Sequence, residues 1–137
     1  MSVYQDLLLS LKKLAKTSQA QLGGVACFIV KNGAIVSSGI NHNPTGEPME
    51  HLVNGKLVSR PKIVHAEVAA INAAAKNLVD ITNATLLVTM SPCLQCAHTI
   101  AQTKVLEVLY MYEWWDKAAL NVLSAAGIKT QKIQEKS

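Results

Sequence analysis

The second half of the chain alternates between segments that favour β-strands and segments that favour helices. The β-prone runs cover residues 84–90, 105–112 and 128–133, and the helical patterns cover residues 65–77, 93–102 and 116–126. Strands that are joined by helices usually pair in parallel, through right-handed crossovers. The alternation therefore limits this half of the chain to a largely parallel sheet that is covered by helices.

The first half adds an amphipathic helix and a β-hairpin to this sheet. Residues 2–16 place apolar side chains on one stripe of a helix, with lysines off the stripe. The β-prone runs 25–30 and 34–38 flank Asn32-Gly33, which is a strong hairpin-turn signal. We therefore predict an α/β fold of three layers, α-β-α, in which helices cover both faces of a five-stranded mixed sheet.

Length and composition indicate a single domain over residues 1–137. Half of the 137 residues are hydrophobic and 16% are charged, which provides for a core and argues against general disorder. No apolar run approaches the ~20 residues of a membrane-spanning helix, and the start does not read as a signal peptide. Three cysteines are too few for a disulfide scaffold, so we expect a cytoplasmic, reducing environment where thiols bind metal or catalyse.

The net charge of +4 is located at the two ends of the chain. Residues 17–128 contain seven basic and seven acidic side chains, so the body of the protein is neutral. Proteins that bind nucleic acids usually concentrate basic side chains on one face or in one groove. The charge pattern therefore argues against nucleic acid as the partner.

Residues 39–62 form a polar stretch that is rich in proline and glycine. We predict one long loop here, between the hairpin and the alanine-rich helix. Long loops in compact domains are often functional, so substrate contacts are expected from this stretch.

Two short segments combine residue types that bind zinc. His65-Ala66-Glu67 opens the alanine-rich helix, and Ser91-Pro92-Cys93-Leu94-Gln95-Cys96 lies where a strand ends and a helix begins. Cys93 and Cys96 are three residues apart, so both sulfurs can point the same way on a first helical turn. A helix N-terminus also stabilises thiolates. We predict that His65, Cys93 and Cys96 bind Zn²⁺ and leave its fourth position open for water.

Glu67 is suited to carry protons in such a site. It lies two residues after His65, which makes it a poor fourth ligand from the same turn but allows it to reach a water on the metal. His-x-Glu with Pro-Cys-x-x-Cys is the signature of zinc-dependent nucleobase deaminases, in which the glutamate is the acid and base. The signature predicts that Glu67 moves a proton from water to the substrate as ammonia leaves.

Two other interpretations of the cysteine pair are weaker. A Cys-x-x-Cys pair also occurs in redox proteins and in structural zinc sites. The residues around Cys93 and Cys96 do not resemble those of a redox motif. A structural site needs a fourth ligand, and His98 lies five residues after Cys93, which directs it away from that face of the helix.

With these motifs, the chain resembles the zinc-dependent cytidine and deoxycytidylate deaminase superfamily, and within it most closely the deoxycytidylate (dCMP) deaminases. The similarity includes Gly39-Ile40-Asn41-His42-Asn43-Pro44-Thr45-Gly46 and Ala126-Gly127-Ile128 besides the two metal-binding segments. It implies a cytidine-deaminase-like fold, hydrolytic deamination and homo-oligomers. It also implies that Asn41 contacts the pyrimidine or sugar, that Ala66 binds the base through its backbone, and that the Ser91 carbonyl accepts from the departing amino group.

Departures from the family pattern lie where a nucleotide would bind. The family usually reads His-Ala-Glu-x-Asn, whereas the fifth position here is Ala69, and Thr45 follows Pro44 where other polar or basic residues are frequent. We expect conversion of dCMP to dUMP and ammonia. Cytidine, deoxycytidine, cytosine or guanine as substrate, deamination within RNA, and a non-catalytic zinc-bearing binding module are the alternatives.

Further substrate contacts are expected from the long loop and from an aromatic cluster. Arg60, the only arginine of the chain, suits bidentate contact with a phosphate, and His42 lies beside Asn41. The cluster follows a predicted strand and consists of Tyr110, Tyr112, Trp114 and Trp115. We expect it, with Tyr112, to form a pocket wall or a subunit interface, and Cys27 to be a buried core residue.

Overall fold

The fold follows the predicted order of helices and strands and adds one hairpin. The computed structural model describes residues 2–114 and 117–135, with side chains from Tyr4 onward. The elements are α1 (Ser2–Ala15), β1 (Ala26–Lys31), β2 (Ala34–Ile40), β3 (Glu50–Val53), β4 (Lys56–Ser59), α2 (Ala66–Lys76), β5 (Thr85–Met90), α3 (Leu94–Ala101), β6 (Glu107–Tyr112), α4 (Ala118–Ala125) and β7 (Lys129–Lys132). Among the described residues, the observed bounds of the predicted elements lie within two residues of the expected ones.

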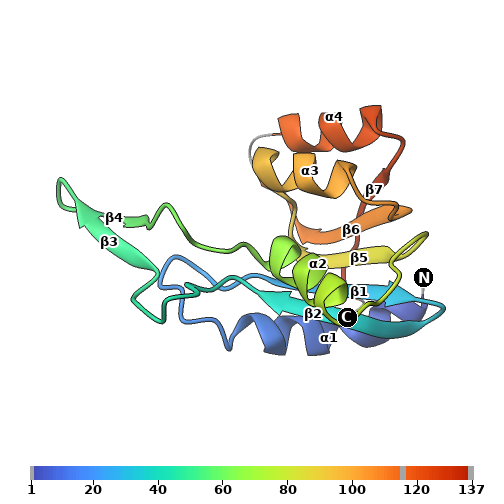
Figure 1. The fold of residues 1–137 in the computed structure, drawn as a ribbon, viewed down its shortest axis with the longest axis horizontal. Helices are drawn as coiled ribbons and strands as arrows, with labels where there is room; N and C mark the ends of the chain where they lie inside the picture. Colours follow the sequence, from blue (N-terminus) through green and yellow to red (C-terminus); the bar gives the residue numbers. More distant parts are fainter. Residues whose placement is uncertain (1, 115–116, 136–137) are drawn as a thin grey trace.

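A five-stranded sheet with strand order β2-β1-β5-β6-β7 forms the centre of the fold (Figure 1). Strand β1 pairs antiparallel with β2 and β5, whereas β5, β6 and β7 pair in parallel. Asn32 and Gly33 both have positive φ, 53° and 79°, as a type I′ turn requires. The predicted mixed sheet is thus confirmed.

Helices cover both faces of this sheet, which confirms the three-layer prediction. Helix α1 packs on one face, against a cluster that includes Phe28, Leu87 and Leu109. Helices α2, α3 and α4 cover the other face, where Leu86 and Val88 belong to the core (Figure 1). Because β1, β5 and β6 are buried on both faces, their sequences are continuous apolar runs rather than alternating ones.

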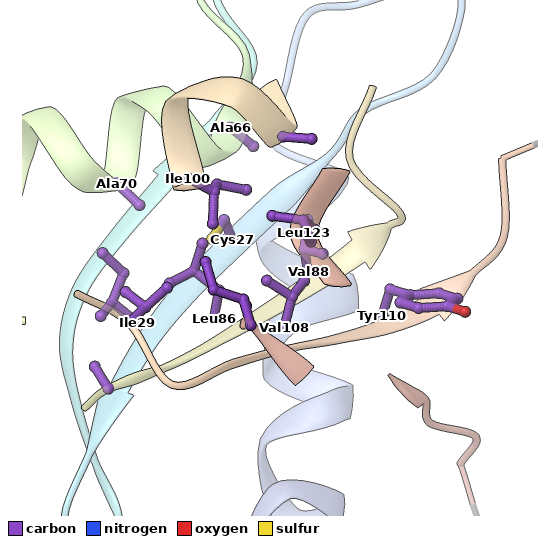
Figure 2. Close-up of a cluster of buried hydrophobic side chains, with 14 of the residues drawn as sticks. Cys27, Ile29, Ala66, Ala70, Leu86, Val88, Ile100, Val108, Tyr110 and Leu123 are labelled. Carbon is purple, nitrogen blue, oxygen red and sulfur yellow. The ribbon is translucent and has the colours of Figure 1, made fainter. Parts of the chain in front are cut away.

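Cys27 is a fully buried residue of this core, as predicted. Figure 2 shows it between the sheet and the helices, near Ile29 and Ile100. Burial raises the pKa of the Cys27 thiol well above its ordinary value, so the thiol stays protonated at neutral pH. It therefore behaves as a small apolar side chain.

The prediction of one continuous loop over residues 39–62 is wrong, because the stretch contains a β-hairpin. Strands β3 and β4 pair only with each other, and the hairpin projects from the body of the molecule (Figure 1). Its turn is Asn54-Gly55, with φ of 52° and 78°. The Arg60 amide donates to the Met49 carbonyl at 2.9 Å and closes the base. The turn signal was present, but the proline-rich and glycine-rich surroundings obscured it.

Within residues 2–114 and 117–135, no helix combines the length and the apolar character needed to cross a membrane.

Candidate active site

The three predicted metal ligands lie together at the starts of two helices. His65 and Cys93 precede α2 and α3 as N-cap residues with extended backbones, and Cys96 lies in the first turn of α3. The ligand atoms of all three residues lie within 4.8 Å of one another. His65 Nδ1 is 3.2 Å from the Cys96 sulfur and 3.5 Å from the Cys93 sulfur. Segments 28 residues apart in sequence therefore converge on one point.

The spacing of these atoms fits a zinc ion. With Zn–N near 2.1 Å and Zn–S near 2.3 Å, tetrahedral coordination places a nitrogen and a sulfur ligand about 3.6 Å apart. The two observed nitrogen–sulfur distances, 3.2 Å and 3.5 Å, are close to this value. His98, the alternative fourth ligand, does not belong to the group of neighbouring metal-binding side chains that the described residues form. A zinc ion held by these three donors would keep one tetrahedral position open, as in catalytic zinc sites.

The thiols are arranged so that one is ionised at neutral pH. A hydrogen bond from the Cys96 thiol, with a second from His65, lowers the pKa of Cys93 to about 4. The same contact with Cys93 raises the pKa of Cys96, and the hydrogen bond to Cys93 raises the pKa of His65. Metal ligands bind in their deprotonated forms, so a thiolate at Cys93 prepares the group for a cation.

Glu67 is buried beside the ligand group, in the first turn of α2. Its side chain is only 4% exposed. Burial raises the pKa of Glu67 from its ordinary value of 4.5 to about 7, with a smaller contribution from the negative charge of Cys93. A carboxyl with such a pKa can both accept and donate a proton near neutral pH.

A cavity of about 350 Å³ opens beside these residues. One wall, here named the catalytic wall, consists of His65, Ala66, Glu67, Ser91 and Cys93. A second part of the lining, here named the hairpin wall, consists of Met49, Glu50, Ser59 and Ile63. The remaining lining residues are Ala20, Leu22, Gly23, Gly24, Val25, Asn41, Met90 and Trp114. None of the described residues that line the cavity is a lysine or an arginine.

The structure brings some of the predicted substrate contacts to this cavity. Asn41, Ala66 and Ser91 line it together with Glu67. Asn41 also fixes the neighbouring loop, because its Oδ1 accepts from the Val25 amide at 2.9 Å and its Nδ2 donates to the Gly23 carbonyl at 3.2 Å. These two bonds leave one N–H and one lone pair of the Asn41 amide for a ligand.

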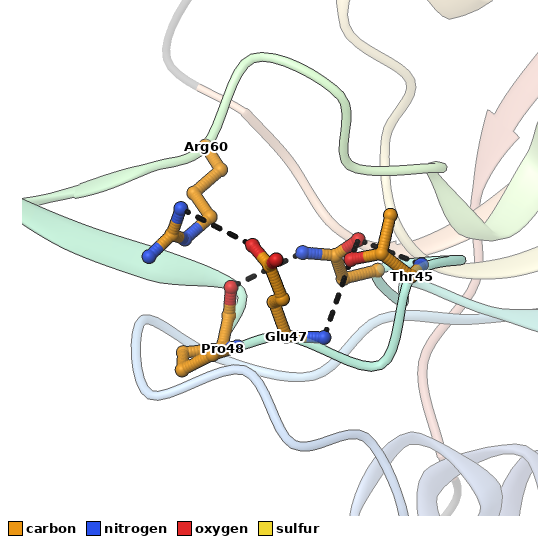
Figure 3. Close-up of polar contacts among 5 residues, drawn as sticks. Thr45, Glu47, Pro48 and Arg60 are labelled. Carbon is orange, nitrogen blue, oxygen red and sulfur yellow. Dashed lines mark hydrogen bonds and ion pairs between the residues drawn. The ribbon is translucent and has the colours of Figure 1, made fainter.

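Three other predicted contacts lie outside the lining. His42 lines a second cavity of about 260 Å³, and its Nδ1 lies 3.0 Å from the Ile40 carbonyl oxygen. Arg60 forms an ion pair with Glu47 at 3.6 Å (Figure 3). Tyr112 is 51% exposed at the end of β6. Their roles toward a substrate stay predictions.

The aromatic cluster contributes one side chain to the cavity. Trp114 is 41% exposed and lines the cavity, and its amide donates to the Ser91 hydroxyl at 2.6 Å. The Ser91 amide donates to the Tyr112 carbonyl at 2.8 Å. Two bonds thus join the end of β5 to the segment that follows β6. Trp115 lies outside the described residues.

The hairpin wall was not among the predicted site residues. Glu50 and Ser59 are opposite one another in the register of β3 and β4, so both side chains lie on the face of the hairpin nearest the cavity. The Asn54-Gly55 turn signal could have placed this pair. It could not have shown which face meets the cavity, because that depends on how the hairpin leaves the body.

Close contact between β2 and α2 determines how near the start of α2, which belongs to the catalytic wall, lies to the sheet. A Cβ atom at Gly39 would lie 2.5 Å from the Ala70 nitrogen and 2.6 Å from the Ala66 carbonyl oxygen. Only glycine therefore allows α2 to approach the strand so closely. The start of α2, with Ala66 and Glu67, depends on this contact.

Comparisons with known proteins agree with this arrangement. The family model for the cytidine and deoxycytidylate deaminase zinc-binding region matches residues 1–112. The deoxycytidylate deaminase of Enterobacteria phage T2 is 30% identical over an alignment of 155 positions, which covers 80% of this chain and 80% of the phage protein. The dCMP deaminase of cyanophage S-TIM5, in complex with dCMP and dUMP, is 28% identical with a TM-score of 0.79, covering 96% of this chain and 95% of that one.

A three-layer fold with one histidine and two cysteines grouped beside a buried glutamate is typical of zinc-dependent hydrolytic enzymes. The chain belongs to the cytidine and deoxycytidylate deaminase family, as the sequence resemblance predicted. Zinc is accordingly the metal that the histidine and cysteine group fits.

Proposed function

We propose that this protein converts dCMP and water to dUMP and ammonia, with His65, Cys93 and Cys96 as zinc ligands. The observation that carries the proposal is the position of Glu67, buried in the cavity wall next to these three residues. A purely structural zinc site has no need of a buried carboxyl at that place. The likeness to deoxycytidylate deaminases of phages supports the choice of substrate.

Glu67 moves the protons of this reaction. Zinc, when held by its three ligands, supplies a Lewis acid that makes water nucleophilic near neutral pH. Ionised Glu67 accepts a proton from the water whose oxygen bonds to C4 of cytosine, and delivers this proton to N3. It then carries the second proton of that oxygen to the amino group, so that the bond between C4 and the amino nitrogen breaks, ammonia leaves, and the C4 carbonyl and N3–H of uracil remain. The Ser91 carbonyl accepts a hydrogen bond from the departing amino group, and the Ala66 backbone and Asn41 orient the base and sugar.

Arg60 is the group that we assign to the 5′-phosphate. Its Nε atom is buried and has no hydrogen-bond partner in the described part of the chain, and its guanidinium is held beside Glu47 (Figure 3). Arg60 follows Ser59 of the hairpin wall, and its guanidinium can exchange Glu47 for a phosphate beside the cavity. Arg60→Ala should raise KM for dCMP about 10-fold and leave KM for deoxycytidine unchanged.

Deamination of a nucleoside is the second candidate. It is favoured by the cavity lining, which has no lysine or arginine among the described residues. A panel of dCMP, CMP, deoxycytidine, cytidine, cytosine and guanine, assayed with the zinc-loaded protein by ammonia release, separates the two. We expect the highest kcat/KM with dCMP. A preference for deoxycytidine over dCMP would reject the nucleotide.

We further propose that residues 1–137 act as one deaminase domain within a homo-oligomer in the cytoplasm. Exposed apolar side chains near the cavity, Leu22 at 58% and Trp114 at 41%, support association between copies. The unpaired thiols of Cys27, Cys93 and Cys96 suit a reducing compartment. Light scattering after size exclusion should give a mass of two or more chains of 14.7 kDa each, and the mass of a single chain would contradict the proposal.

A further inference from the structure

The hairpin wall contains a second buried carboxylate, and the reaction described above does not use it. Glu50 is the first residue of β3, lines the cavity and is only 6% exposed. Burying an ionised carboxylate is unfavourable unless hydrogen bonds or opposite charges compensate it. The hydrogen bonds and charged groups around Glu50 should therefore indicate which function its carboxylate has.

The protein supplies only part of this compensation. Glu50 Oε2 accepts from the Leu22 amide at 3.1 Å. Among the described residues, no lysine, arginine or histidine lies within ion-pair distance of this carboxylate. The nearby Arg60 instead contacts Glu47 (Figure 3). The second carboxylate oxygen thus keeps its acceptor capacity, in a residue that lines the cavity.

The position of Glu50 is fixed by the base of the hairpin. It lies opposite Ser59 in the β3–β4 register. The neighbouring residues Met49 and Arg60 are also joined, because the Arg60 amide donates to the Met49 carbonyl at 2.9 Å. The Leu22 contact ties the carboxylate to the loop that Asn41 also holds. A buried acceptor held in this way is a preorganised recognition group.

The geometry of the substrate indicates which part of it meets Glu50. C4 of cytosine must lie at the catalytic wall, next to Glu67. N1, which carries the sugar, is on the opposite side of the six-membered ring. The sugar is therefore directed away from α2 and α3, toward the rest of the cavity. Its hydroxyl groups are hydrogen-bond donors, and a carboxylate is an acceptor only.

We propose that Glu50 is a specificity-determining residue that accepts a hydrogen bond from a hydroxyl of the substrate sugar. Its charge also disfavours a phosphate at the same position, which leaves the 5′-phosphate to another part of the site. The assignment rests on the proposed function, because it needs a cytosine nucleotide or nucleoside in the cavity.

The test compares two substrates that differ in one hydroxyl, dCMP and 2′,3′-dideoxycytidine 5′-monophosphate, with the zinc-loaded full chain. The unmodified protein should prefer dCMP in kcat/KM by about 10- to 100-fold. Glu50→Ala should abolish this preference, by lowering kcat/KM for dCMP while changing that for the dideoxy substrate less than about threefold. Glu50→Gln keeps an acceptor oxygen and the side-chain shape, so it should retain an intermediate preference.

A merely structural Glu50 would give a different pattern. If Glu50 only held the Leu22 loop, Glu50→Ala would lower kcat/KM equally for both substrates and leave their ratio unchanged, which would overturn the assignment. Equal rates for both substrates with the unmodified protein would also overturn it. If deoxycytidine but not dCMP is turned over, the ratio of kcat/KM for deoxycytidine to that for 2′,3′-dideoxycytidine should fall in Glu50→Ala, and an unchanged ratio would overturn the assignment. Absence of ammonia from every cytosine compound would reject the proposed function and this assignment with it.

Discussion

The two walls of the cavity are built in different ways. The catalytic wall comes from the starts of α2 and α3, which lie on a sheet that is buried on both faces. The hairpin wall comes from the base of a two-stranded hairpin that pairs only with itself. Chemistry thus depends on the core of the molecule, and recognition depends on a peripheral element. We expect substitutions in the catalytic wall to alter turnover, and substitutions in the hairpin wall to alter the choice of substrate.

The largest effect is expected from Glu67→Gln in the catalytic wall. Glutamine keeps the shape of the side chain but cannot transfer a proton, so kcat should fall by about 10³- to 10⁴-fold. Zinc content, measured by elemental analysis, should stay at the unmodified level, because the three ligands are unchanged. A variant with normal turnover would contradict the assigned role. Loss of zinc in this variant would show instead that Glu67 supports the ligand group.

The same residue should make the stability of the metal-free protein depend on pH. The pKa of Glu67 is about 7 in the folded protein and near 4.5 in the unfolded chain, so the folded state binds the proton more tightly. Its contribution to stability is complete below pH 4.5 and is lost as pH rises through 7. Between pH 5 and 8, Glu67→Gln should gain about 2–3 kcal/mol relative to the unmodified chain.

Urea unfolding at several pH values, with a chelator present, measures this difference. Zinc would add its own binding free energy, which is itself pH-dependent, and would obscure the contribution of Glu67. If the free energies of unfolding of Glu67→Gln and the unmodified chain differed by the same amount across this pH range, the Glu67 carboxyl would have an ordinary pKa.

A smaller effect is expected at the contact that holds α2 against the sheet. Gly39→Ala places a Cβ 2.5 Å from the Ala70 nitrogen and 2.6 Å from the Ala66 carbonyl oxygen, so α2 must shift. We expect a loss of about 1–3 kcal/mol in the free energy of unfolding, together with reduced kcat. The neighbouring Ser38→Ala is the matched control, because Ser38 is exposed, and should change stability by less than about 0.5 kcal/mol. Equal free energies of unfolding and equal kcat for both variants would show that α2 can shift without cost.

The smallest effect is expected at the far end of the hairpin. Leu52 is 71% exposed, and the hairpin wall is held by its base and not by this end. Leu52→Ser should therefore change kcat/KM less than about twofold and stability by less than about 0.5 kcal/mol. A clear loss of stability, or a smaller mass in light scattering, would show that another chain covers this position.

The sequence predicted the catalytic wall because its signals are local. His65 and Cys93 each immediately precede a helix, and the spacing of Cys93 and Cys96 brings both to its first turn. Such patterns involve a few neighbouring residues with strong preferences. The continuous apolar runs of β1, β5 and β6 predicted the sheet in the same way, because burial on both faces leaves no other composition.

The hairpin wall was not predictable to the same degree. The Asn54-Gly55 turn is a local signal, but the surroundings of Glu50 depend on the loop around Leu22, which is 28 residues away. No local sequence pattern predicts that these two segments are in contact. The amide of Asn41 shows the same limit, since its contacts with Gly23 and Val25 fix a loop whose position only the folded chain defines.

The closed base of the hairpin has a consequence for how this scaffold can change. The Arg60 amide meets the Met49 carbonyl at 2.9 Å, so the chain leaves and re-enters the body at neighbouring points. A segment with adjacent ends can be lengthened, shortened or exchanged with little strain on the sheet. Residues 50–59 are therefore a natural place for grafting. Exchanging them between related deaminases would transfer Glu50 and Ser59, two of the four residues of the hairpin wall, and leave the ligand group in place.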